Sequence, residues 1–205
     1  MNVYNFFARS TTKFNESYLN QLDTKELTMI RDTTDVSYLF FKNKVVEVKE
    51  NSISFIDYIN VGGFVWQKNI IPHDFQTIDL KSDFETFINN ISNKDEQRKL
   101  ILESAIGYLL STYKKQDEGL AIVLYDETLN DNPSGRTGKT IISKALGHMR
   151  KLVTLNGKEF DNKGNFPYDV VNLDDNIICF DDMERTFKLE TLFSIMTGNL
   201  TLKKK

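Results

Sequence analysis

A glycine-rich stretch that ends in a Lys-Thr pair, PSGRTGKT, occupies residues 133–140. It stands between an apolar run at residues 120–126, LAIVLYD, and a stretch whose apolar residues recur at helical spacing. This order predicts a loop that connects a buried strand to the N-terminus of a helix. Backbone N–H groups there lack intrahelical partners and lie at the positive end of the helix dipole, so the loop favours an anion.

The residue types in this loop suit phosphate groups. Gly135 and Gly138 allow the chain to curl around phosphate oxygens, Lys139 can reach the β- and γ-phosphates, and the Thr140 hydroxyl can ligate Mg²⁺. The P-loop pattern G-x-x-x-x-G-K-[ST] places its first glycine at position 133, where this chain has proline. We predict a nucleoside triphosphate site that comprises Pro133, Ser134, Gly135, Arg136, Thr137, Gly138, Lys139 and Thr140.

A second chemical signal lies downstream, where the apolar run Ile177 to Phe180 ends on Asp181 and Asp182. Two acids at the end of a buried strand form the Walker B arrangement, which serves the Mg²⁺ ion and the attacking water. Each signal alone has an ordinary explanation, a glycine turn before a helix and an acidic turn after a strand. Because both occur in the expected order, we favour the nucleotide site.

The elements that must position these residues begin with a β-rich region at residues 36–71. The runs VSYLFF, VVEVK, SISFIDY and GGFVWQKNII, separated by turn signals, predict a small antiparallel sheet. Two helices should follow, capped by Ser82 with Glu85 and by Asn93 with Glu96. The second is apolar nearly all round over residues 100–110, so we expect it to be buried on two sides.

These patterns predict three parts. They are a small β-rich domain at residues 1–81, a helical linker or collar at 82–118, and the N-terminal part of a P-loop ATPase domain at 119–205. The fold class is α/β P-loop NTPase, AAA+-like with an incomplete parallel sheet, preceded by a small α+β domain. The run at 120–126 should be a strand buried on both faces. The helix after the loop should bury Ile141, Ile142, Ala145, Leu146 and Met149.

Composition limits the class of protein. The chain has 205 residues, 40% of them hydrophobic, which is typical of a globular protein. Its net charge of −3 argues against a freestanding basic nucleic-acid module but permits local DNA contacts. No apolar segment approaches the roughly 20 residues that span a bilayer, so we expect a cytoplasmic protein without a membrane partner. The single cysteine, Cys179, excludes an internal disulfide and is expected to be a buried small residue.

The stretches AIVLYDE, NPSGRTGKTIISKALG, VTLNGKEF and VNLDDNIICFDDM together resemble the helicase segment of phage and plasmid primase-helicases. These proteins belong to superfamily 3 of the AAA+ ATPases. The resemblance extends from about Gln97 to the C-terminus. It implies a DNA helicase of phage or mobile-element replication that hydrolyses ATP to translocate on single-stranded DNA. By resemblance, Lys139, Asp181 and Asp182 are catalytic, Thr140 and Asp181 hold Mg²⁺, and Asp182 activates water.

The resemblance also implies a homo-hexameric ring in a bacterial host cytoplasm. These helicases carry a sensor strand and an arginine finger after Walker B, and the sequence stops at Lys205 before either. We therefore expect a truncated chain that is inactive by itself, with the sensor strand missing between the Walker A and Walker B strands. Two alternatives remain open: another P-loop NTPase such as a small-molecule kinase, and a catalytically silent fragment.

Several further residues have two possible interpretations. The terminal Lys203, Lys204 and Lys205 form either a solvated end or, by resemblance, a DNA-gripping channel hairpin. Trp66 could stack on a base, but packing in the core of the small sheet is favoured. The arginines near the motifs are interpreted as solvated surface residues rather than as an arginine finger: Arg136, Arg150 and Arg185. His73 and His148 lack a second ligand at metal-binding spacing.

Overall fold

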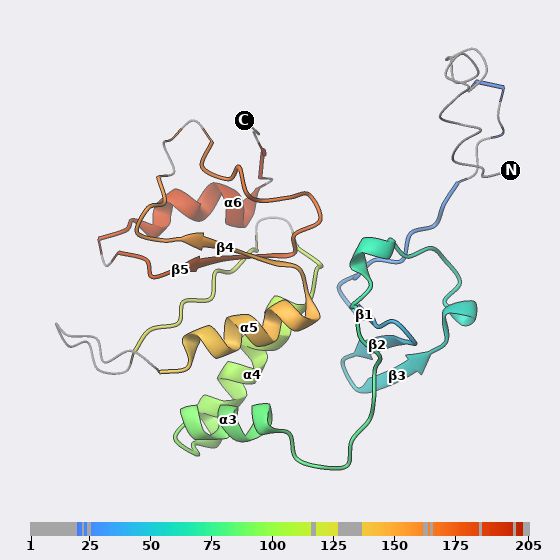
Figure 1. Ribbon diagram of the computed structural model, residues 1–205, viewed down its shortest axis with the longest axis horizontal. Helices are drawn as coiled ribbons and strands as arrows, with labels where there is room; N and C mark the ends of the chain where they lie inside the picture. The colour runs from blue at the N-terminus through green and yellow to red at the C-terminus, as the bar shows by residue number, and fades with distance from the viewer. Residues whose placement is uncertain are drawn as a thin grey trace, which may run out of the picture.

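The computed structural model describes residues 20–21, 23, 26–115, 118–126, 137–161, 164, 166–184, 186–198 and 200–202. Figure 1 shows the strands and helices in two groups, with β1 to β3 in one and the remaining labelled elements in the other. Their bounds are β1 Val36–Phe40, β2 Val45–Lys49, β3 Ser52–Ile56, η2 Tyr58–Asn60, η3 Gln67–Asn69, α3 Asp83–Ile91, α4 Glu96–Leu110, α5 Lys139–Met149, β4 Leu152–Asn156, β5 Ile177–Asp181, η4 Leu189–Leu192 and α6 Phe193–Thr197. No helix in the described part of the chain is both long and apolar enough to cross a bilayer.

The predicted antiparallel sheet is confirmed, in the order β1-β2-β3. Its core contains Phe41, Val46 and Ile71. The fourth predicted run, residues 62–71, is not a strand and touches its neighbours only through isolated bridges. The reason is local, because the N–H groups of Asn69 and Ile70 donate to nearby carbonyls in η3 and cannot join a ladder.

The two predicted helices are present, but only the first has the predicted cap. The Ser82 hydroxyl accepts a hydrogen bond from the backbone N–H of Glu85, as expected. The second helix, α4, is capped by Asp95, whose carboxylate accepts from the N–H of Arg98 at 2.8 Å. The predicted cap Asn93 is wrong, because it lies in the preceding turn with φ at 55°. The short turn therefore moves the capping oxygen two residues along the chain.

Helix α4 is partly buried on one side rather than buried on two, and none of its residues is fully buried. Its side chains Leu102, Ile106, Leu109 and Leu110 pack on a core that contains Ile142 and Leu146 of α5. On its other side Leu100 and Ile101 are exposed. The helices that pack on it are α3 and α5. The all-round apolar pattern therefore leaves an exposed apolar face on α4.

The α/β part is built on one parallel pair of strands, β4 and β5, with Leu152 opposite Ile177 and Asn156 opposite Asp181. Side chains alternate between the faces of a strand, so Leu152 and Ile177 share a face, and both pack toward α5. The opposite face carries Leu155 and belongs to a second core with Tyr168 and Val171. Figure 1 shows β4 and β5 between α5 and α6. The apolar run that ends at Asp181, predicted to be a strand, is thus confirmed as the strand β5.

The apolar run at 120–126 does not form the predicted buried strand. It has no strand partner among the described residues, and Leu120, Val123 and Tyr125 are exposed. Figure 1 draws it as coil. The parallel sheet, as far as the structure describes it, contains only β4 and β5. The run therefore has no neighbouring strand for backbone hydrogen bonds and no layers that cover both of its faces.

Candidate functional site

The candidate site begins at the N-terminus of α5, where Gly138 has φ at 95°. A Cβ on this residue would lie 2.7 Å from the ring of Phe87, so both backbone conformation and space require glycine. The Gly138 carbonyl accepts from the N–H groups of Ile141 and Ile142, which starts the helix. No described side chain caps the helix. The first turn of α5 therefore presents Lys139 and Thr140 directly after a left-handed glycine.

Lys139 is held by a carboxylate. Its Nζ atom donates to Oδ1 of Asp126 at 2.6 Å and to the hydroxyl of Thr137 at 3.0 Å. The hydrogen bond from Lys139, followed by that from Thr137, lowers the pKa of Asp126. The ammonium group predicted to bind phosphate is thus engaged by an anion. An incoming phosphate would have to compete with this carboxylate for the same donor.

Asp126 is a residue that the motif did not single out. Its signal in the sequence is its position, as the polar residue that ends the apolar run just before the glycine-rich loop. Although the run at 120–126 is not a strand, it still brings this carboxylate to the start of α5. The described part of the loop, Thr137 to Thr140, and the end of the run therefore meet in space.

The acidic end of β5 forms a second group. Asp181 closes the strand, and its carbonyl accepts from the N–H of Gly157 at 2.6 Å. Asp182 follows with φ at 58°, and its carboxylate pairs with Nζ of Lys158 at 2.5 Å. The hydrogen bond and charge of Asp182 raise the pKa of Lys158. Lys158, from the segment after β4, is another residue that the motif reasoning missed.

The two groups face the same side of the molecule but are not in contact. In Figure 1 the carboxyl ends of β4 and β5 and the beginning of α5 lie toward the same side. Within the described residues, no hydrogen bond or ion pair joins Lys139 or Thr140 to Asp181 or Asp182. The described chain also holds no cluster of three His, Cys, Asp or Glu side chains. A Mg²⁺ ion bound through one hydroxyl, phosphate oxygens and waters does not need such a cluster.

The remaining predicted site residues lie outside the described residues. They are Pro133, Ser134, Gly135 and Arg136 of the loop, and Lys203, Lys204 and Lys205 at the C-terminus. Arg185 is also among the residues that the structure does not describe. Of the predicted metal ligands, Thr140 is exposed in the first turn of α5 and Asp181 ends β5. The single cysteine, Cys179, is half-buried in β5, and burial raises the pKa of its thiol.

Arg150 is not a solvated surface residue, contrary to the prediction. Its side chain is 6% exposed and pairs at 3.3 Å with Asp32, whose side chain is 2% exposed. The guanidinium also donates to the carbonyls of Leu110 and Tyr38, both at 2.7 Å. Burial lowers the pKa of Arg150, and the charge of Asp32 opposes this shift. One buried arginine thus connects α4, α5 and the N-terminal sheet.

Trp66 is not packed in the core of the small sheet, contrary to the interpretation that the sequence favoured. It is 62% exposed and immediately precedes η3. The core position near this segment is taken by Ile71, which bridges to Phe41.

Comparisons of the chain with protein-family models, with curated sequences and with solved structures gave no match. The case for a function therefore rests on the residues and their geometry.

Proposed function

We propose that this chain binds Mg²⁺-ATP at the N-terminus of α5. We further propose that it is the nucleotide-binding part of a superfamily 3 type DNA helicase of phage or mobile-element replication. In this proposal ATP hydrolysis drives translocation on single-stranded DNA in the host cytoplasm, and six copies form a ring. The observation that carries the proposal is the placement of Lys139 and Thr140 in the first turn of a helix that follows a left-handed glycine.

The phosphate chemistry follows from this first turn. The Lys139 ammonium is already positioned by two oxygen acceptors, so it can exchange Asp126 for the phosphate oxygens of a nucleotide without a large movement. The Thr140 hydroxyl belongs to the same turn and can supply one oxygen to a phosphate-bound Mg²⁺. The positive end of the helix dipole favours the same anion. These features support a triphosphate rather than a neutral ligand.

The end of β5 supplies the acids that hydrolysis requires. Asp181 closes a strand that packs against α5 through Ile177, so its backbone is fixed relative to that helix. Asp182 is exposed and held by Lys158. We assign Asp181 to the metal and Asp182 to the attacking water. In the described geometry Lys158 pairs with Oδ2 of Asp182, so we assign the acceptance of a proton from water to Oδ1.

Binding of Mg²⁺-ATP to the chain of 205 residues tests the site itself. Lys139→Ala should weaken binding by about tenfold or more, because a charge-assisted hydrogen bond contributes about 1.5–3 kcal/mol. The matched control is Lys144→Ala, which removes an exposed lysine from the same helix. Calorimetric titration measures both. Equal affinity of Lys139→Ala and the parent chain would refute the site.

Hydrolysis with and without single-stranded DNA tests the helicase assignment. We expect residues 1–205 alone to show no DNA-stimulated turnover, because the run at 120–126 has no strand partner among the described residues. Robust DNA-stimulated turnover by this chain would contradict the expectation that a sensor strand is missing between the Walker A and Walker B strands. ATP consumption that depends on an added small-molecule phosphate acceptor, and not on DNA, would favour the kinase alternative.

A further inference from the structure

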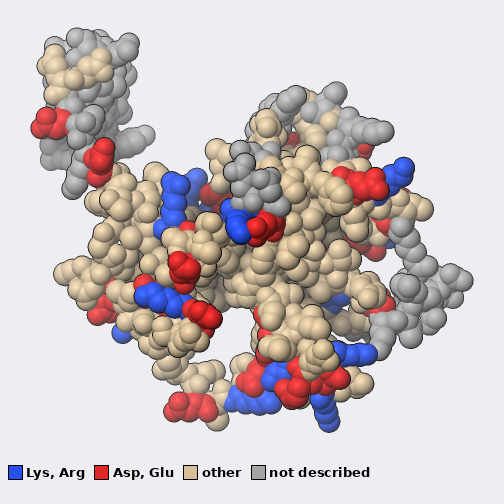
Figure 2. All heavy atoms as spheres, turned by 180° about the vertical axis from the view of Figure 1, so that it is seen from behind, with Lys and Arg blue, Asp and Glu red and all other residues tan. Residues whose placement is uncertain are grey.

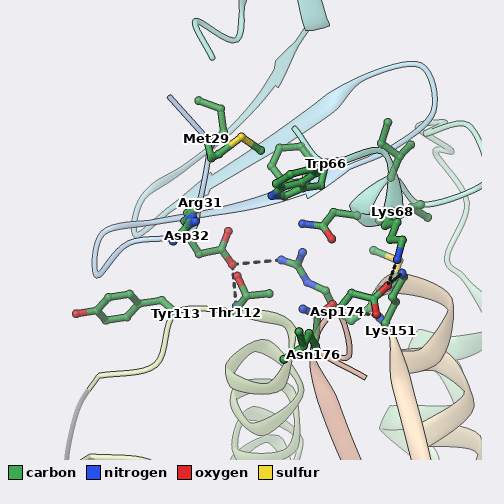
Figure 3. A pocket seen from close by; sticks show the side chains of 18 of the residues that line it. Met29, Arg31, Asp32, Trp66, Lys68, Thr112, Tyr113, Lys151, Asp174 and Asn176 are labelled. Carbon is green, nitrogen blue, oxygen red and sulfur yellow. Dashed lines mark hydrogen bonds and ion pairs between the residues drawn. The ribbon is translucent and has the colours of Figure 1, made fainter. Parts of the chain in front are cut away.

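A cavity of about 810 Å³ lies where the N-terminal sheet meets the turn from α5 to β4. Figure 3 shows side chains that line it from segments far apart in the sequence. The lining residues come from 29–32, Phe40, 66–72, 112–114, 147–151 and 173–176, all within the described residues. The volume falls in the range of small-ligand sites. The Lys139 ammonium is not among the groups that line it, so it is separate from the proposed ATP site.

The cavity is positively charged in a chain that is acidic overall. Its lining contains five cationic side chains, Arg31, Lys68, Lys114, Arg150 and Lys151, against two acidic ones, Asp32 and Asp174. The chain itself has a net charge of −3. On the face shown in Figure 2, basic and acidic side chains are interspersed. The excess of three positive charges in one cavity is therefore a local feature, and it favours an anionic ligand.

The two acids do not neutralise these cations. Asp32 accepts from two backbone N–H groups and is paired with the buried Arg150. Asp174 is shared, because Lys151 pairs closely with it and Lys68 lies 3.8 Å away. No described residue pairs with the exposed guanidinium of Arg31. Lys114 donates only to backbone carbonyls. Arg31 is therefore available to phosphate oxygens, and Lys68 and Lys151 share a single carboxylate, which leaves part of their positive charge to attract a phosphate.

The cavity also carries an exposed aromatic surface. Trp66, the single tryptophan of the chain, is 62% exposed and lines the wall next to these cations. In Figure 3 its indole lies on the side of the cavity opposite Asn176. Leu173 lines the same cavity and is 94% exposed. A flat apolar ring beside several cations matches a nucleotide, which joins a stacking base to a phosphate.

We propose that this cavity binds nucleotides of single-stranded DNA, with a base stacked on Trp66 and phosphates on Arg31, Lys68 and Lys151. The choice of DNA rests on the proposed function, whereas the nucleotide chemistry rests on the cavity alone. A strand fits better than a duplex, because paired bases are not free to stack on a side chain. The Lys68 side chain is 76% exposed, so a strand that approaches from solvent can reach it.

The single tryptophan gives a direct assay, because its fluorescence reports on this cavity and no other site. Titration with an oligo(dT) of about 12 nucleotides should quench it saturably, whereas free dTMP should bind far more weakly. The same quench is expected in the Lys139→Ala variant, so failure of the ATP site leaves this test intact. Absence of quenching by the oligonucleotide, or equal affinity for dTMP, would overturn the assignment to a strand.

Variants separate stacking from charge, with a labelled oligonucleotide and fluorescence anisotropy as the readout. Trp66→Ala should weaken binding about fivefold to 150-fold, and Trp66→Phe should retain most of the affinity. Lys68→Ala should reduce the slope of log K against log salt by about 0.7. The control Lys42→Ala removes an exposed lysine from the turn between β1 and β2, outside the cavity. Normal binding by Trp66→Ala, or an equal loss in Lys42→Ala, would show non-specific attraction and refute the site.

Discussion

The buried pair of Arg150 and Asp32 gives a prediction whose size follows from the structure. Arg150→Met removes hydrogen bonds to Asp32 and to two carbonyls, those of Tyr38 and Leu110. Removing one partner of a buried pair costs about 3–5 kcal/mol. Asp32 keeps two backbone donors at 2.8 Å, from Tyr38 and Thr112, so we expect the lower end of this range. The free energy of unfolding should fall by about 3 kcal/mol, against a typical total of roughly 5–15 kcal/mol.

Urea unfolding at 25 °C, followed by far-UV circular dichroism, measures this loss. Lys144→Ala should change the free energy of unfolding by less than about 0.5 kcal/mol, as an exposed position does. The double variant with Asp32→Asn should lose less than the sum of the single losses, because the two side chains interact directly. If Arg150→Met is too unstable to measure, Arg150→Lys keeps the charge without the planar fork and should show a smaller loss. A loss below about 1 kcal/mol in Arg150→Met would refute the burial of this pair.

Three further predictions concern the candidate nucleotide site. Gly138→Ala should destabilise the chain by about 1–2 kcal/mol, because alanine disfavours the left-handed conformation. The control is Gly147→Ala in α5, where an added Cβ would meet no atom closer than 3.9 Å and should not destabilise the chain. Urea unfolding of the two variants compares their free energies of unfolding. In a chain that hydrolyses ATP, Asp182→Asn should slow ATP turnover while Mg²⁺-ATP still binds, whereas Asp181→Asn should weaken the binding of Mg²⁺. An unchanged turnover rate in Asp182→Asn would show that the two roles are reversed. The hydrogen bond from Lys139 lowers the pKa of Asp126, so the ion pair should persist as pH falls from neutral to the ordinary carboxyl value of about 3.9 and be lost only as pH falls through the lowered pKa. Carbon NMR of the Asp126 carboxyl measures the midpoint, and a midpoint at or above the ordinary value would contradict the contact.

Local signals in the sequence predicted the local structure well. The hydroxyl of Ser82 caps α3, and the run ending at Asp181 is a strand. In each case residues within a few positions of one another set the outcome. The antiparallel sheet was also predictable from local signals, because short turns join its strands. Of the predicted apolar stripe of α5, Ile142 and Leu146 are buried, whereas Ile141, also predicted to be buried, is 50% exposed. The strand β4, Leu152–Asn156, was not predicted from the sequence.

Features that depend on distant partners could not be predicted in this way. A continuous apolar run such as 120–126 becomes a strand only where other strands flank it, and here β4 takes the described partner edge of β5. Arg150 is buried because Asp32, 118 residues away, is positioned to pair with it. Trp66 is exposed because Ile71 occupies the core instead. The Lys139 to Asp126 contact likewise joins the two ends of a loop that the motif treats as independent.

Helix α5 extends from one proposed ligand site to the other. It begins at Lys139, in the proposed ATP site, and its other end supplies Gly147, His148 and Met149 to the cationic cavity, directly before Arg150. The helix is about 16 Å long, at 1.5 Å per residue. Thermodynamic linkage is reciprocal, so if ATP changes the affinity for a strand by some factor, the strand changes the affinity for ATP by the same factor. Because the residues at both ends belong to one helix, binding at either site can be coupled to the other only through α5 or the elements that pack on it.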